Sequence, residues 1–235
     1  MRTEVRAEIA ALAEPAYRDF SQKLLPGCGG IQGVRLPALR RLARELARTG
    51  GWRDYLAEYF AEDGPGRWFE EDMLAGMCIG AAKLPAEEAV SLARRFRPRI
   101  GNWSVCDSFC TGFRAVSRER EAFWPFVTEC LETGEEYGVR LGAVLLLAHY
   151  RTPEWADRAV ALLAEISHPG YYARMAAAWA LSMFYLDFPE KVLPLLEGGA
   201  LQQEVRRMTI RKICESRRPS PEEKARLRAL GGGVS

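Results

Sequence analysis

The sequence predicts an all-α protein, an α-solenoid of helix pairs that is curved and carries a basic concave face. Apolar residues recur at helical spacing along almost the whole chain, and the alternation typical of strands is nearly absent. Glycine and proline stand in short turns between the helical stretches. The helix pairs recur about every 35 residues, a period at which stacked repeats bury their faces against their neighbours.

Turn residues mark the ends of the predicted helices. Pro37 lies in the first turn of its helix, where the missing N–H costs little, and Gly50 and Gly51 end that helix. The run Gly64-Pro65-Gly66 separates two further helices. We expect about 12 to 14 helices, over residues 3–13, 15–25, 34–46, 52–61, 67–82, 85–97, 103–115, 119–131, 136–149, 153–165, 171–185, 189–196, 201–215 and 221–230.

The connections between these helices predict a single domain over residues 1–235. No long linker or low-complexity segment interrupts the regular succession of helices. The spacing fits an α-solenoid of HEAT type, in which each pair buries its face only by stacking on the next. A compact helical bundle is the structural alternative.

Size and composition describe an ordinary soluble protein. A chain of 235 residues, 48% hydrophobic and 27% charged, buries a sizeable core without disulfide or metal support. No apolar run approaches the roughly 20 residues that span a bilayer. The first residues are charged and lack the apolar segment of a signal peptide. We therefore expect a cytoplasmic protein with no membrane contact.

The cysteines are most simply reduced core residues. Most of the six lie in apolar helical patterns. Cys106 and Cys110 share a helix face, a spacing that metal sites also use. With only two histidines and no CxxC motif, however, the sequence favours no zinc site. We expect no metal and no cofactor.

Positive charge gathers toward the C-terminus although the net charge is only +2. Residues 201–235 hold nine Lys or Arg against four Glu, a local excess of +5. Several of these cations recur at helical spacing and form a basic stripe that fits phosphate binding. A solvated helix face is the alternative interpretation of the same pattern. The stripe comprises Arg206, Arg207, Arg211, Lys212, Arg217 and Arg218.

Four residues carry the candidate chemistry: Trp103, Asp107, Arg140 and Trp179. Trp103 and Asp107 stand four residues apart, so a helix presents both from one face. Arg140 opens a run that must be mostly buried, and an arginine in a helix's first turn usually reaches for an anion. Each residue also has a structural explanation. Trp103 and Trp179 fit core packing, Asp107 fits a cap or an ion pair, and an internal carboxylate would equally satisfy Arg140.

The order and spacing of several motifs resemble the DNA alkylation repair family of AlkD-like proteins. The run Gly33-Val34-Arg35-Leu36-Pro37-Ala38-Leu39-Arg40 is similar to the family's early G-[VI]-R-x-P-x-L-R helix. Trp103 to Asp107 is similar to its W-x-x-x-D motif, and Arg140 and Trp179 follow at family-like spacing. The resemblance covers nearly the whole chain. Cys106 stands where an aliphatic residue is more usual in active members.

The resemblance implies a DNA glycosylase that excises positively charged alkylpurines, 7-methylguanine and 3-methyladenine, from double-stranded DNA. It implies Asp107, Trp103 and Trp179 as catalytic residues. Phosphate contacts are expected from Arg140, Arg174, Arg206, Arg207, Arg211 and Lys212. We expect a monomer. Two alternatives stay open, a non-catalytic DNA-binding solenoid of the same superfamily and a protein-binding HEAT scaffold.

Overall fold

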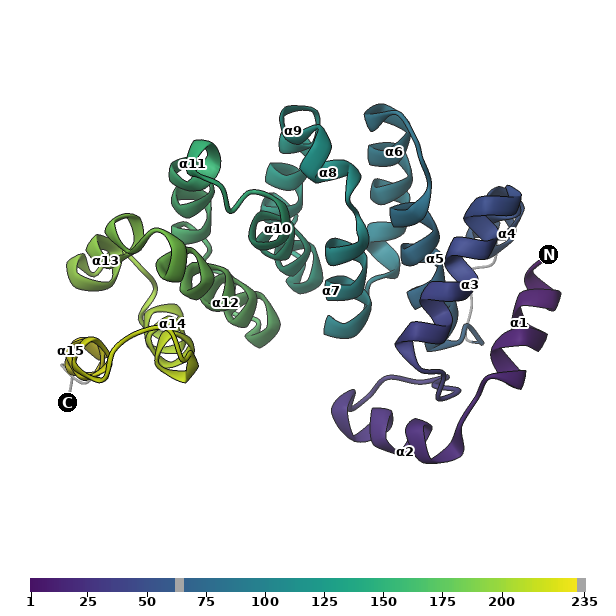
Figure 1. Ribbon diagram of the computed structural model, residues 1–235, viewed down its shortest axis with the longest axis horizontal. Coiled ribbons are helices and arrows are strands. Elements are labelled where there is room, and N and C mark those ends of the chain that lie inside the picture. Colours follow the sequence, from purple (N-terminus) through teal and green to yellow (C-terminus); the bar gives the residue numbers. More distant parts are fainter. Residues whose placement is uncertain (62–65, 232–235) are drawn as a thin grey trace. The chain divides into compact units, whose positions relative to one another are not determined.

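The computed structural model describes residues 1–61 and 66–231, and these residues form α-helices, a 3-10 helix and no strand (Figure 1). The chain folds into two compact units, Met1–Arg118 and Glu119–Ser235. The predicted all-α class is confirmed, and neighbours in the sequence stack as in an α-solenoid. The predicted single domain, curvature and basic concave face stay predictions.

The first unit is built around α5, which is buried on all sides. Helices α3 and α7 pack against α5, while α4 and α6 lie outside this row (Figure 1). Glycine permits the closest approach: a Cβ on Gly80 of α5 would stand 2.9 Å from the carbonyl oxygen of Gly112 at the end of α7. The elements are α1 (Arg2–Ala11), α2 (Pro15–Leu24), α3 (Leu36–Thr49), α4 (Trp52–Ala61), α5 (Phe69–Ala81), α6 (Ala86–Phe96), η1 (Arg97–Arg99), α7 (Trp103–Gly112) and α8 (Ala115–Arg118).

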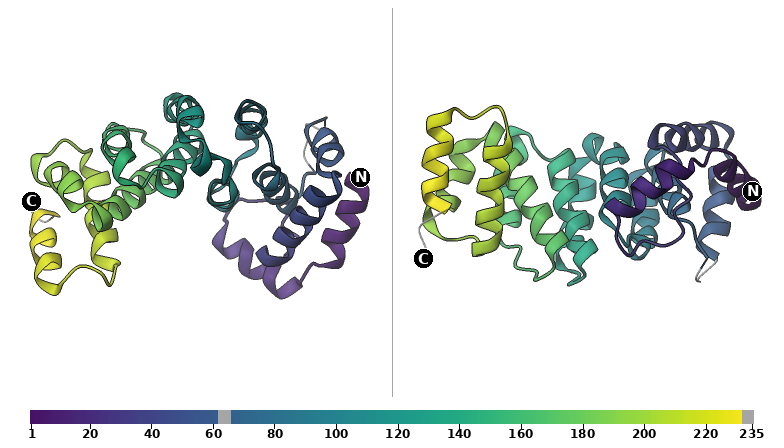
Figure 2. Two further views of the ribbon diagram at one scale, coloured as in Figure 1. Left: turned by 45° about the horizontal axis from the view of Figure 1, so that its top comes forward. Right: turned by 90° about the horizontal axis from the view of Figure 1, so that it is seen from below.

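The second unit repeats this plan. Helices α10, α12 and α14 pack in a row, with α9 against α10, α11 and α13 against α12, and α15 against α14 (Figure 2). The inner helices α10 and α12 are almost wholly buried because their apolar residues cover every side. The elements are α9 (Arg120–Glu132), α10 (Glu136–His149), α11 (Pro153–Ala164), α12 (Tyr171–Asp187), α13 (Pro189–Gly198), α14 (Gln203–Glu215) and α15 (Pro221–Gly231).

Every predicted helix is present, and two short elements were not predicted. The expected helix over 103–115 ends at Gly112, and α8 follows as a separate turn because Phe113 leaves the helical conformation. The 3-10 helix η1 continues α6 through Pro98. Pro37 and Gly50 occupy the predicted first-turn and C-cap positions of α3. The predicted break at Gly64-Pro65 lies outside the described residues.

Within the described part of the chain, no helix is both long and apolar enough to cross a membrane.

Candidate functional site

Trp103 and Asp107 share one partly exposed face of α7. Helix α7 starts at Trp103 because the side chain of Asn102 caps it: Asn102 Oδ1 accepts the backbone N–H of Val105 at 3.0 Å. The backbone carbonyl of Asp107 accepts a hydrogen bond from the Thr111 hydroxyl at 2.8 Å. Both candidate side chains are half-buried, so the predicted pairing of an indole and a carboxylate is present on a surface.

Two residues close to Asp107 in the sequence, Cys106 and Phe109, point into the core of the first unit. Cys106 is fully buried, and Phe109 is buried against Phe96 and Phe113 at ring-centroid distances of 5.1 and 4.9 Å. Because these side chains point into the core of the unit, they do not cover the face that presents Asp107. The unusual Cys106 is thus a packing residue.

The cysteines follow the predicted pattern, and no disulfide joins them. Cys78, Cys106, Cys110 and Cys130 are buried. Burial raises the pKa of the Cys78 thiol well above its ordinary value, which disfavours the thiolate that metals bind. No group of three or more potential metal ligands occurs among the described residues.

Arg140 ties two inner helices of the second unit together. The side chain is buried, and its Nη1 donates to the carbonyl oxygen of Tyr172 at 3.1 Å. Glu136, one turn earlier in α10, accepts the N–H of Tyr172 at 2.6 Å, and the Tyr137 and Tyr172 rings stack at 5.5 Å. Arg140 therefore has a positioning role at the start of α12. Its expected phosphate contact stays a prediction.

Trp179 lies on a partly exposed stripe of α12. Tyr172, Met175 and Met183 fall on the same side at helical spacing, and all are half-buried like Trp179. Arg174 lies five residues before Trp179, about 140° away around the helix by the helical period, and is also half-buried. Its Nε is buried without a hydrogen-bond partner among the described residues. Trp179 and Arg174 therefore do not present one common surface.

The predicted cations of α14 divide among different surfaces. Arg206 donates through Nε to the carbonyl oxygen of Leu196 at 2.6 Å, at the end of α13. Arg207 and Arg211 are exposed and line a groove of about 390 Å³ beside α15. Lys212 pairs with Glu215 at 2.8 Å. Arg207 and Arg211 are paired more loosely, with Glu204 at 3.7 Å and Glu215 at 3.9 Å, and their phosphate contacts stay predictions.

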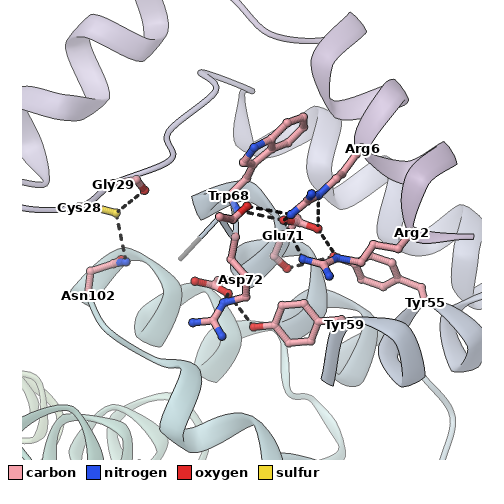
Figure 3. Close-up of polar contacts among 12 residues, drawn as sticks. Arg2, Arg6, Cys28, Gly29, Tyr55, Tyr59, Trp68, Glu71, Asp72 and Asn102 are labelled. Carbon is pink, nitrogen blue, oxygen red and sulfur yellow. Dashed lines mark hydrogen bonds and ion pairs between the residues drawn. The ribbon is translucent and has the colours of Figure 1, made fainter. Parts of the chain in front are cut away.

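An ionic cluster at the start of α5 was not predicted from the sequence. Glu71 is fully buried and accepts from Arg2 Nε at 2.6 Å and from Arg6 Nη2 at 2.8 Å (Figure 3). It also accepts the N–H of Trp68 at 2.9 Å, which caps the helix. Burial alone would raise the pKa of Glu71, but the hydrogen bonds from Arg6 and Arg2 outweigh it and hold the pKa below its ordinary value.

Glu70 fixes the loop that leads into α3. Its carboxylate accepts the backbone N–H groups of Gln32, Gly33 and Val34 at 2.9, 2.8 and 3.2 Å. Gly33 has φ +94°, and a Cβ there would stand 2.5 Å from the carbonyl oxygen of Glu14, so only glycine fits. The early glycine motif of the sequence is therefore a structural junction that a buried carboxylate holds.

Asp72, the third acid of this run, points to a different set of partners. Its Oδ1 accepts the Tyr59 hydroxyl at 2.6 Å and lies 3.3 Å from Arg67 Nε (Figure 3). Burial raises the pKa of Asp72 to about 6, although the Tyr59 hydrogen bond opposes the rise. Three consecutive acids in the first turn of an otherwise apolar helix were the available signal, because carboxylates at the start of a buried helix require partners.

The model of the DNA alkylation repair enzyme family matches residues 5–213 of the chain. No curated protein and no solved structure matches it significantly. The chain therefore belongs to the DNA alkylation repair enzyme family. Membership assigns it a role in DNA repair as an enzyme, with DNA as its partner.

Proposed function

We propose that the protein is a DNA glycosylase that excises positively charged alkylpurines, such as 7-methylguanine and 3-methyladenine, from duplex DNA. The observation that carries the proposal is the half-exposed face of α7 with Trp103 and Asp107, in a member of a DNA alkylation repair family. The buried positions of Cys106 and Phe109 support it, because neither side chain lies on that face.

The chemistry requires few groups. A cationic alkylpurine is already a good leaving group, so no general acid has to protonate it. Its departure leaves an oxocarbenium-like sugar, as in glycoside hydrolysis. The Asp107 carboxylate would stabilise this cation and orient the attacking water. The half-buried carboxylate of Asp107 on α7 fits that requirement.

The remaining residues would hold the DNA. Trp103 and Trp179 would present their π faces to the electropositive sugar edge or to the cationic base. Arg140 would contact a backbone phosphate by a charge-assisted hydrogen bond. The surface cations of the second unit would add salt-sensitive, sequence-independent affinity. Arg207 and Arg211 fit this role best because they are exposed on one groove.

The test is excision by the wild-type protein. A duplex with one 7-methylguanine is incubated with excess protein, and free base is measured by chromatography. We expect release well above the spontaneous rate, and no release from the same duplex with unmodified guanine. No release above background from the modified duplex, by protein that binds it, would contradict the proposal and favour the non-catalytic DNA-binding interpretation.

A further inference from the structure

A cleft of about 620 Å³ opens in the first unit beside the start of α7. Three segments distant in the sequence form it: the glycine-rich stretch before α3, the residues around the start of α5, and the turn that leads into α7. In the close view, Cys28 and Asn102 form one pair in contact, and Asp72 and Tyr59 form a second pair (Figure 3). The lining residues are Cys28, Gly29, Gly30, Gln32, Gly66, Arg67, Trp68, Phe69, Asp72, Pro98, Arg99, Gly101 and Asn102.

The charges on this lining favour an anion. Among the described residues that line the cleft, Arg67 and Arg99 are cationic and Asp72 is anionic. The Asp72 carboxylate is partly occupied within the protein, because it accepts the Tyr59 hydroxyl at 2.6 Å. Arg99 lies over the Tyr59 ring at 5.9 Å, and Arg67 lies beside the Asp72 carboxylate that accepts the Tyr59 hydroxyl.

Arg67 supplies a donor that suits an acceptor ligand. Its Nε is buried and makes no hydrogen bond among the described residues, although it lies 3.3 Å from Asp72 Oδ1. Arg67 and Asp72 are close enough to form an ion pair, but the N–H of Arg67 Nε is not aligned for a hydrogen bond to Asp72. Arg67 is therefore only loosely paired in the cleft wall, where a phosphate would give its guanidinium a second anionic partner.

Glycine keeps the backbone of the cleft accessible. A Cβ on Gly29 or on Gly101 would meet no atom within 4 Å, so open space adjoins both backbones. Glycine-rich backbone allows a phosphate to approach main-chain N–H groups closely. The Cys28 thiol does not compete with a phosphate for Arg67 and Arg99, since burial raises the pKa of the thiol and keeps it neutral.

We propose that this cleft is a phosphate-binding site that holds a backbone phosphate of the bound DNA. Asn102, which lines the cleft, precedes Asp107 by five residues, or about 7.5 Å along a helix. Duplex DNA advances about 3.4 Å along its axis per base pair. A duplex whose axis runs parallel to α7 would therefore place this phosphate about two base pairs from the sugar at Asp107. The DNA source rests on the DNA-binding role of the family and does not require excision.

Asp72 makes the site sensitive to pH. It faces Tyr59 of α4 and Arg67 before α5, and it interacts electrostatically with Glu71, Arg2 of α1 and the Cys28 thiol. Arginine, tyrosine and this thiol keep their charge states between pH 5 and 8, and Glu71 stays ionised because its pKa is lowered. Protonation of Asp72 as the pH falls through about 6 raises the net charge of the cleft, so phosphate binding strengthens.

The first test measures affinity for an unmodified duplex as a function of salt. Arg67→Gln and Arg99→Gln should each weaken binding about tenfold and lower the slope of log K against log salt by about 0.9. Arg53→Gln is the matched control, because Arg53 pairs with Glu88 at 2.6 Å outside the cleft. Unmodified DNA separates this test from excision. Unchanged slopes in both variants, with folded protein by circular dichroism, would overturn the DNA assignment.

The second test uses a substitution that strengthens binding, which loss of folding cannot imitate. Asp72→Asn should raise duplex affinity about threefold at pH 7.5 and leave it unchanged at pH 5, where the wild-type carboxylate is already neutral. Inorganic phosphate is the probe for the alternative source. Thermal stabilisation by phosphate over chloride at equal ionic strength, lost in Arg67→Gln and Arg99→Gln while the DNA slopes stay unchanged, would support a free phosphate as the ligand. No response to phosphate, to the Asp72 change or to salt would overturn the site altogether.

Discussion

The two units use different means to hold their inner helices. In the first, buried carboxylates of α5 bind segments far away in the sequence: Glu71 binds α1 and Glu70 binds the loop before α3. In the second, the inner helices α10 and α12 meet mainly through buried apolar side chains, with Arg140 as a charged exception. Helices that are neighbours in the stack are held mainly by apolar faces. Helix α1, which is distant from α5 in the sequence, is held against it by specific polar contacts.

The difference has a thermodynamic consequence. A buried ion pair contributes little net stability against an apolar substitute of the same shape, but breaking it by removing one partner is costly. An apolar core instead loses stability in proportion to the cavity that a truncation leaves. The loss of stability caused by a mutation should therefore differ between the two units, both in its magnitude and in its dependence on charge and pH.

The largest effect is expected at Glu71. Glu71→Gln leaves Arg2 and Arg6 opposite a neutral group and should lower the free energy of unfolding by about 3–5 kcal/mol, measured by urea denaturation at pH 7.5. Glu88→Gln, which removes the partner of Arg53 on the surface, should cost less than about 1 kcal/mol. Equal losses in both variants would show that the buried cluster is no different from a surface pair.

A slightly smaller loss is expected from the apolar core of the second unit. Leu145 of α10 is fully buried, and Leu145→Ala should cost about 3 kcal/mol through lost transfer energy and a cavity. This loss should be the same at pH 5 and pH 8. The exposed Leu24 is the control, and Leu24→Ala should change stability by no more than about 0.5 kcal/mol. A Leu145 effect that varies with pH would contradict the purely apolar description.

Asp72 should respond to pH in the opposite sense to Glu71. The folded-state pKa of Asp72 is raised to about 6 from an ordinary value of 3.8, so the wild-type protein loses stability as the pH rises between these values. Asp72→Asn should therefore be about 1–2 kcal/mol more stable than wild type at pH 8 and equal to it near pH 4.

For Glu71, whose folded-state pKa is lowered, the stabilisation is present above its ordinary pKa and is lost as the pH falls. Unfolding curves of Glu71→Gln and of Asp72→Asn, measured across pH 4 to 8, distinguish the contributions of the two carboxylates to stability. The comparison fails if Asp72→Asn is less stable than wild type at pH 8.

The smallest effect concerns the caps of α7 and α14. Asn102 caps α7 through its side chain, whereas Gln202, at the same position of α14, makes no side-chain cap. Asn102→Ala should cost about 1 kcal/mol and Gln202→Ala no more than a few tenths. Thermal unfolding measures both. Equal effects would show that the Asn102 cap does not hold the helix that presents Trp103.

Helix existence was predictable because apolar periodicity and turn residues are local signals. The ends of α4 and α10 match the predicted ranges, since glycine, proline and clear changes in pattern bound them. The separate turn α8 was not predictable, because it depends on how Phe113 packs against Phe109. Tertiary contact overrode the local pattern there.

The candidate site was predictable only where it is local. The four-residue spacing placed Trp103 and Asp107 on one face because helical geometry alone decides that. The surfaces of Arg174 and Arg206 were not predictable, since they depend on which side of each helix its neighbours cover. The cluster around Glu71 joins residues more than sixty positions apart, and no spacing rule reports such contacts.

The most direct test of the proposed function is single-turnover release of 7-methylguanine by Asp107→Asn. The substitution keeps the shape of the side chain and removes the charge that would stabilise the sugar cation. We expect the excision rate to fall by about 100-fold or more while duplex affinity stays within about twofold. Asp54→Asn, an exposed aspartate of α4, should retain the wild-type rate. Release by Asp107→Asn at the wild-type rate would contradict the assignment of Asp107 as the catalytic carboxylate.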